Sequence, residues 1–139
     1  MTINEIQDNI ISDFSIFEDD VESKLMYLMD IGDKIPPMSE ENKINDNLIK
    51  GCMSRVWVRP EIHDGKVTFE ADSNTKITKG LISLLVQIWN GKTPHEIVNT
   101  DLYFIDKIGM SRMIGFQRGN GLEMMINHIH RFAFKNMSI

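Results

Sequence analysis

The hydrophobic pattern of this 139-residue chain changes its period in the middle, and that change constrains the fold more than any other feature. Between residues 55 and 71 the pattern is typical of strands, and Val67, Phe69 and Ala71 alternate with polar residues. Asp64-Gly65 divides this region and predicts a tight hairpin turn. Before and after it, apolar residues recur every three or four positions, as in helices. Because alternating strand–helix–strand units are absent, the order predicts an α+β fold.

Helices are predicted on both sides of the hairpin, and capping signals give their ends. Gly32 is expected to stop the second helix, and Asn120, with Glu123 three residues later, is expected to cap the last one. One or two short helical turns are expected around Gly109. The predicted helices run from Thr2 to Phe17, from about Asp19 to Gly32, from about Thr75 to Gly91, from Thr93 to about Asn99, and from Asn120 onward.

The predicted sheet is short, antiparallel and three-stranded, with helices packed on one side. Residues 55–58 are rich in branched and aromatic side chains, which favour a strand. Pro60 lacks an N–H group, so it should end this strand or lie on an edge. Leu48 and Ile49 are expected to add a short third strand before a turn at Gly51.

Composition restricts the classes of function. The chain is 42% hydrophobic and 25% charged, which fits one domain over residues 1–139. Its formal net charge of −5 argues against a general nucleic-acid binder. The longest apolar run, residues 81–89, is far shorter than the ~20 residues of a membrane helix, and the N-terminus lacks a signal-peptide pattern. We expect no membrane partner and a cytoplasmic, reducing location.

Cys52 is the only cysteine, and it follows Gly51, which fits a sharp turn. A lone thiol can form neither an internal disulfide nor a four-thiolate metal site. Most free cysteines are small buried apolar residues. The turn and the charged neighbours Lys50 and Arg55 favour another interpretation, a redox or sulfur-handling nucleophile.

Sulfur chemistry requires a thiolate, which needs partial access and nearby positive charge. Arg118 is a candidate for that charge if the fold brings it near Cys52. The helix N-terminus expected at Asn120 would add to the effect. The alternative for Arg118 is a solvated side chain or a surface ion pair.

The sequence gives little support for other kinds of catalytic site. A thiol hydrolase would need a histidine base with an orienting partner. His63 and His95 are expected at the surface, and His128 and His130 are two residues apart on a helix, so they do not share a face. We therefore predict no metal site. Met53 lies in an irregular stretch, where a thioether can form an adaptable contact surface.

Five segments taken together carry a more specific signal. The first is Gly51-Cys52-Met53-Ser54-Arg55-Val56-Trp57, and the others cover residues 28–36, 71–82, 93–98 and 118–125. In this order, from about Phe14 to Ala133, they resemble the SufE family, whose motif around the cysteine is GCxSxVW. The chain departs from the family in three places: Met53 replaces a glutamine, Asn74-Thr75 replaces Asp-Ala, and Gly115-Phe116-Gln117 replaces a Ser/Thr-Pro-Ser stretch.

The resemblance implies a sulfur acceptor that acts with a PLP-dependent cysteine desulfurase (SufS-like). Cys52 would take up sulfane sulfur as a persulfide, stimulate the desulfurase, and pass the sulfur to a SufB-type iron–sulfur scaffold complex. Arg118 would stabilise the thiolate or persulfide. Such a protein has no cofactor and no independent turnover, and it is a monomer or homodimer. The residues expected to contact a partner are Gly51, Met53, Ser54, Arg55 and Asn74.

The resting position of the thiol is a further expectation. Cys52 should pack against apolar residues near Arg118 and swing outward when a partner docks, because a carrier must shield its persulfide between partners.

Two other classes of function stay open. A scaffold of the IscU type, thought to share this fold, would need several cluster ligands from one chain, and one cysteine argues against it. The other is an adaptor protein with an inert thiol.

Overall fold

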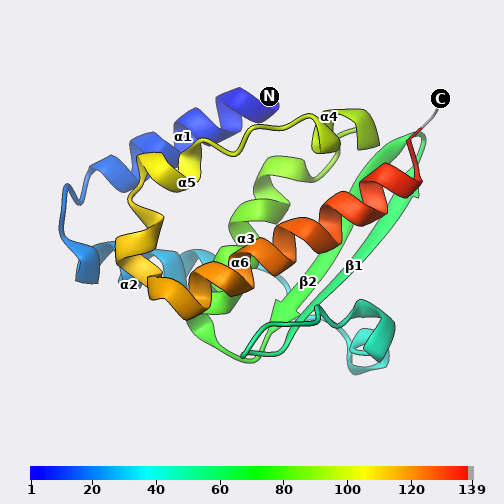
Figure 1. Ribbon diagram of the computed structural model, residues 1–139, viewed down its shortest axis with the longest axis horizontal. Coiled ribbons are helices and arrows are strands. Elements are labelled where there is room, and N and C mark those ends of the chain that lie inside the picture. Colours follow the sequence, from blue (N-terminus) through cyan, green and yellow to red (C-terminus); the bar gives the residue numbers. More distant parts are fainter. Residues whose placement is uncertain (138–139) are drawn as a thin grey trace.

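A long hairpin and a set of helices make up the fold of the computed structural model, which describes residues 1–137 (Figure 1). This part of the chain holds six α-helices, two short 3-10 turns at Glu40–Asn42 and Asn45–Asn47, and a two-stranded antiparallel sheet, so the class is α+β as predicted. The predicted domain extends to Ile139, and its last two residues lie outside the described range. The elements are α1 (Ile3–Ser15), α2 (Val21–Asp33), β1 (Val56–His63), β2 (Lys66–Ser73), α3 (Lys76–Trp89), α4 (Pro94–Val98), α5 (Phe104–Lys107) and α6 (Met110–Lys135).

The hairpin forms where the alternating pattern predicts it. Strands β1 and β2 pair without a break from Val56 opposite Ser73 to His63 opposite Lys66. The turn residues Asp64 and Gly65 both have positive φ, 53° and 77°, as a tight hairpin turn requires. Pro60 lies inside β1, which is tolerated because each strand of a two-stranded sheet is an edge.

The predicted third strand is wrong. Leu48 makes only an isolated bridge to Trp57, and the N–H of Ile49 donates to the carbonyl oxygen of Val56 at 2.8 Å. A 3-10 turn ends at Asn47, and Gly51 turns the chain with φ +88°. Too few residues remain extended between these two turns to form a strand.

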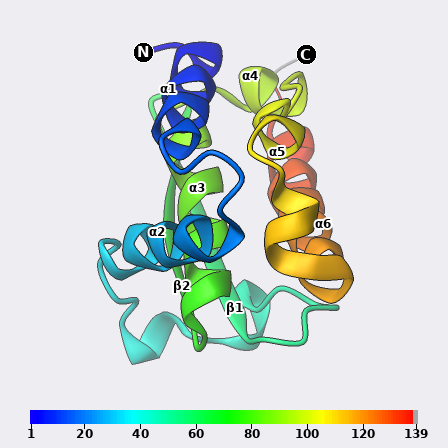
Figure 2. The same ribbon diagram turned by 90° about the vertical axis from the view of Figure 1, so that its left-hand side faces the viewer.

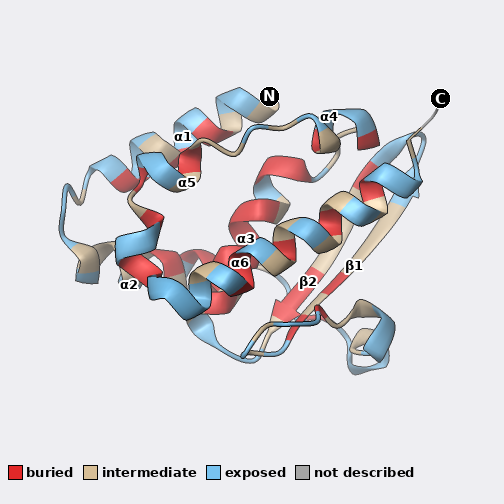
Figure 3. Ribbon diagram, in the orientation of Figure 1, coloured by how far each residue is buried: buried red, intermediate tan, exposed pale blue. Residues whose placement is uncertain are grey.

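Helix α3 is the centre of the core, as the buried positions in Figure 3 show. It packs on β2, and α2 crosses it closely. At the crossing, a Cβ on Gly80 would lie 2.3 Å from the carbonyl oxygen of Leu28, so only glycine fits. Gly32 lies inside α2 at the same crossing, and α2 ends one residue after it, at Asp33. Pro36 and Pro37 follow and prevent the helix from continuing.

Helix α6 runs along the molecule beside α4, α5 and the core (Figure 2). It contains a break at Gly115, where φ is 80° and ψ is 177°. The helix resumes directly after that residue, so the predicted start at Asn120 is wrong. Asn120 and Glu123 match a capping pattern but lie inside a continuous helix. None of the helices in residues 1–137 has the length and apolar character needed to cross a membrane.

Candidate functional site

Cys52 lies on a loop whose two ends are tied to the sheet. The Ile49–Val56 hydrogen bond and the Leu48–Trp57 bridge close the loop at its base. Gly51 precedes the thiol with φ +88°, a conformation that other L-residues adopt only with strain. A Cβ at this position would also lie 3.2 Å from the side chain of Met124 in α6. The sharp turn predicted before Cys52 is therefore present.

Asn74 and Ser73 hold the second half of this loop. The N–H of Arg55 donates to Oδ1 of Asn74 at 2.9 Å, and the N–H of Asn74 donates to the carbonyl oxygen of Arg55 at 3.1 Å. The Ser73 hydroxyl donates to the same carbonyl oxygen at 2.8 Å. Asn74 thus positions the backbone of Arg55, with an amide oxygen that accepts as a carboxylate oxygen would. The predicted contacts of these residues with a partner stay predictions.

Three hydroxyl groups join the loop to the first turn of α3. The Thr75 Oγ1 lies 3.0 Å from the Oγ of Ser54 and 2.7 Å from the Oγ1 of Thr78. A hydroxyl carries one hydrogen, so Thr75 donates to one of these groups and accepts from the other. Thr78 is buried, so the chain of hydroxyls runs from the exposed loop into the protein.

The thiol of Cys52 is half-buried against the apolar core, as expected for the resting state. Its Sγ donates to the carbonyl oxygen of Gly121 at 3.5 Å. Burial raises the pKa of the Cys52 thiol above its ordinary value. Because burial disfavours the thiolate, the resting thiol is protonated at neutral pH.

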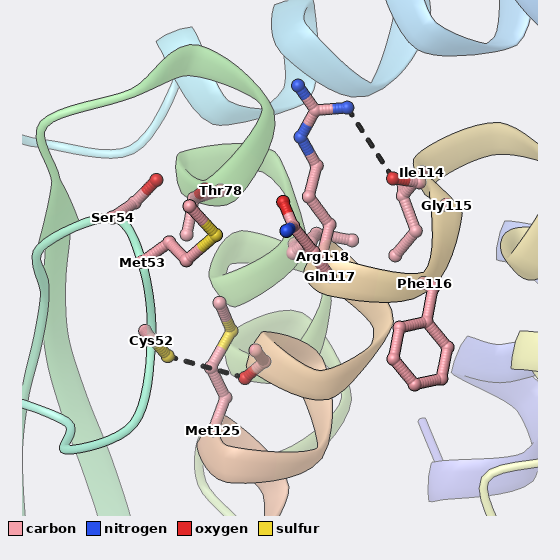
Figure 4. Close-up of a pocket in the computed structure, with 12 residues that line it drawn as sticks. Cys52, Met53, Ser54, Thr78, Ile114, Gly115, Phe116, Gln117, Arg118 and Met125 are labelled. Carbon is pink, nitrogen blue, oxygen red and sulfur yellow. Dashed lines mark hydrogen bonds between the residues drawn. The ribbon is translucent and has the colours of Figure 1, made fainter.

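A cavity of about 450 Å³ lies beside the thiol (Figure 4). The loop supplies one wall, α3 supplies the floor, and both sides of the break in α6 supply the rest. Leu81 and Met125 make its interior partly apolar, and Gly121 brings the α6 backbone up to the thiol. The lining residues are Cys52, Met53, Ser54, Thr78, Leu81, Ile114, Gly115, Phe116, Gln117, Arg118, Gly121 and Met125.

Arg118 lines this cavity together with Cys52, but its guanidinium is not at the thiol. Its Nη1 donates to the carbonyl oxygen of Ile114 at 3.5 Å, and Figure 4 shows the guanidinium pointing away from Cys52. The structure therefore brings the two residues to one site without the contact that would favour a thiolate. Asn120 adds no helix N-terminus, because the helix has resumed after Gly115. The role of Arg118 stays a prediction.

Two large apolar side chains at the cavity are exposed to solvent. Met53 is 81% exposed and Phe116 is 84% exposed. Met53 is among the residues that the sequence predicts to meet a partner. Phe116 is not among those residues. The only signal for it in the sequence is the departure from the family pattern at residues 115–117.

The histidines lie elsewhere. His63 contacts Glu61 at 3.0 Å on the hairpin, and His95 is exposed on α4. Burial lowers the pKa of both His128 and His130, which lie on α6. No histidine is among the residues that line the Cys52 cavity, so the cavity offers no imidazole base for a thiol hydrolase.

Comparison with known proteins places this chain in a family. The SufE model, described as an Fe-S metabolism associated domain, matches residues 8–133. An uncharacterized SufE-like protein of Rhizobium meliloti is 35% identical over 127 residues, which cover 88% of this chain and 90% of the relative. One from Synechocystis is 39% identical over 102 residues, covering 73% of this chain and 64% of the relative.

The fold also matches a solved structure. The solution structure of a hypothetical protein from Thermus thermophilus superimposes with a TM-score of 0.76 and covers 94% of each chain, at 17% identity. At that identity the likeness concerns the fold alone. Together with the motif around Cys52, the family match over most of the sequence assigns the protein to Fe–S metabolism, and the chain belongs to the SufE family.

Proposed function

We propose that this protein is a sulfur carrier that accepts sulfane sulfur on Cys52 from a PLP-dependent cysteine desulfurase. The observation that carries the proposal is the position of the only thiol, on a closed loop beside a partly apolar cavity. A loop can enter the site of another protein while the rest of the fold stays rigid. The cavity can shelter a terminal sulfur atom between partners.

The transfer step conserves atoms and electrons. The Cys52 thiolate attacks the outer sulfur of the persulfide on the donor cysteine. A bond forms between Sγ and that sulfur, the sulfur–sulfur bond of the donor breaks, and its electron pair leaves on the donor cysteine as a thiolate. Cys52 then carries a persulfide, and no external oxidant or reductant is consumed.

The resting geometry suits a carrier that reacts only when docked. In isolation the thiol is half-buried and its pKa is raised, so little thiolate is available. Movement of the loop away from Gly121 would expose Sγ to solvent and remove the cause of that raised pKa. Arg118, already at the cavity, is free to turn toward the new negative charge, since it holds only one long hydrogen bond to Ile114.

The second half of the proposed cycle delivers the sulfur to an iron–sulfur scaffold complex of the SufB type. The carrier stimulates the desulfurase by removing its persulfide, and it turns over only between these two partners. A free thiol of this kind needs a reducing compartment, such as the cytoplasm.

The direct test is a mass measurement. The protein is mixed with a cysteine desulfurase and L-cysteine, and the intact chain is weighed without reductant. We expect a gain of one or more sulfur atoms, lost after dithiothreitol and absent in Cys52→Ser. The substitution should leave the thermal midpoint close to that of the wild type, because serine has a similar size.

No gain in mass with a cognate desulfurase that releases alanine would reject the proposal and favour an inert-thiol adaptor. An iron-dependent chromophore on the isolated protein would favour a scaffold instead.

A further inference from the structure

The Cys52 cavity opens between the two most exposed large apolar side chains of residues 1–137. These are Phe116, at 84%, and Met53, at 81%. Both line the cavity, and they reach it from different segments, α6 and the loop (Figure 4). Water-exposed apolar groups of this size, placed together around a reactive group, are typical of the centre of a protein interface.

The charged side chains on residues 50–55, 74–81 and 110–121, the segments that line the cavity, are all basic. Lys50, Arg55, Lys76 and Arg118 are all exposed, and within the described part of the chain none of them forms an ion pair. We call these four side chains the basic rim. Lys79 is excluded because it lies 3.6 Å from the carboxylate of Asp72.

The segments that carry the basic rim contain no carboxylate. Residues 50–55, 74–81 and 110–121 include neither aspartate nor glutamate, although the whole chain has 20 acidic residues against 15 basic ones. The segments meet at one end of the molecule, where the loop, the start of α3 and the break in α6 surround the cavity (Figures 1 and 2). The excess of acidic residues therefore lies elsewhere.

We infer that Met53, Phe116 and the basic rim form one docking face for an acidic surface that surrounds the persulfide cysteine of the sulfur donor. This inference rests on the proposed function and names how the donor is recognised. The apolar pair would be buried at the centre, and the four cations would meet carboxylates at the edge. A second copy of this chain does not fit the face in a symmetric pair, because the four cations of each copy would oppose those of the other.

Exposed charges of this kind act mainly on encounter. Long-range attraction raises the association rate and is screened by salt, with a Debye length of about 8 Å at physiological ionic strength. Once the complex has formed, the chemistry depends on Cys52 and Arg118, and the other three cations of the rim take no part in it. Substitutions that reverse these three charges on this face should therefore lower kcat/KM for the carrier and leave kcat nearly unchanged.

The test measures the rate of sulfur transfer to this protein from a cysteine desulfurase as a function of carrier concentration and salt. The variant is the double charge reversal Lys50→Glu and Lys76→Glu, which leaves Cys52, Arg118 and the Asn74 contacts untouched. The control is Lys66→Glu at the hairpin turn, an exposed lysine without an ion pair in the described structure. Each variant is first checked for an unchanged thermal midpoint.

We expect the wild-type kcat/KM to fall as salt rises. At low salt the double variant should be about tenfold slower with a weaker salt dependence, and Lys66→Glu should behave like the wild type. A wild-type rate in the double variant, or a rate insensitive to salt, would overturn the docking face while sulfur uptake itself still stands. A wild type that gains no sulfur would end both proposals.

A binding test with polyanions distinguishes the acidic protein surface from a nucleic acid as the partner of the basic rim. If heparin or single-stranded RNA binds the wild type and not the double variant, while sulfur transfer by the two is equal, the basic rim serves a nucleic acid and the inference is wrong. If sulfur transfer alone responds, the acidic protein surface is supported.

Discussion

The thiol of Cys52 donates a hydrogen bond to the carbonyl oxygen of Gly121, 3.5 Å away in α6. Only the protonated sulfur can donate this bond, and burial of the site raises the pKa of the thiol and so disfavours the thiolate. The contact therefore couples the position of the loop to the protonation state of the Cys52 thiol. A Cβ on Gly121 would lie 3.7 Å from Sγ, in ordinary contact, so the approach of the two segments is close but unstrained.

Alkylation should reveal the raised pKa of Cys52. The reaction of iodoacetamide requires the thiolate, so its rate follows the deprotonated fraction. In the folded protein we expect the pH midpoint of the rate to lie above that of the same protein in denaturant, because burial disfavours the thiolate. Equal midpoints in the two states would show that burial does not raise the pKa, and a lower midpoint in the folded protein would show that the resting thiol is already activated.

Thr75→Val should loosen the loop. Valine keeps the shape of threonine but removes the hydroxyl that bonds to Ser54 and Thr78. A hydrogen bond contributes about 0.5–1.5 kcal/mol, so the open loop should become several-fold more populated and Cys52 should be alkylated correspondingly faster. Thr68→Val in β2 is the matched control and should leave the rate unchanged. If both variants react at the wild-type rate, the hydroxyl chain does not restrain the loop.

Asp72 should contribute a pH-dependent part of the stability. Burial alone would raise the pKa of this carboxyl, but N–H donors of Met38 and Ser73 at 3.0 and 2.8 Å, with the Lys79 and Lys43 ammonium groups, hold it below its ordinary value. The stabilisation is therefore complete above the pKa of an unfolded aspartate, about 3.9, and is lost as the pH falls through the lower folded value.

The measurement is urea unfolding of Asp72→Asn and wild type across that range. At neutral pH we expect the variant to lose about 1–3 kcal/mol of unfolding free energy, and the difference should shrink in acid. Asp30→Asn, at an exposed position of α2, is the control and should change little. A difference that does not depend on pH would mean that the charge of Asp72 is not what stabilises the fold.

Gly80→Ala should destabilise the crossing of α2 and α3. The new methyl group would lie 2.3 Å from the backbone oxygen of Leu28, and neither helix can yield without moving the core. Overpacking of this kind costs about 1–3 kcal/mol, measured as a lower midpoint of chemical unfolding. Gly119→Ala is the control, because its methyl group would meet nothing within 4 Å and alanine favours a helix. A wild-type midpoint for Gly80→Ala would contradict the crossing geometry.

Local patterns account for the features that the sequence predicts correctly. The Asp64-Gly65 turn and the capping box of Thr93 with Glu96 are decided by neighbouring residues, so a sequence shows them directly. The same logic misplaces the start of the last helix. A capping pattern at Asn120 fits a helix start, but the break depends on the backbone of Gly115, which only the surrounding structure fixes.

Relationships between distant segments are harder to predict. The sequence alone could not show whether the fold brings Arg118 near Cys52. In the structure the two residues line one cavity, but the Arg118 guanidinium bonds to the carbonyl oxygen of Ile114 and not to the thiol. The pairing of Asn74 with Arg55 and the exposure of Phe116 depend on how loop, sheet and helix meet. Sequence spacing carries no information on these contacts, since each is decided by packing.

The hydrogen bond between Ile49 and Val56 closes the loop and so limits how far Cys52 can extend from the protein. With both ends held by the sheet, residues 50–55 act as a short double tether, and a chain that rises about 3.5 Å per residue can extend its middle by roughly 10 Å. If Cys52 accepts sulfur as proposed, the donor must offer its persulfide at a shallow depth or on an arm of its own. A donor whose reactive cysteine lies in a deep, rigid shaft could not transfer sulfur to Cys52.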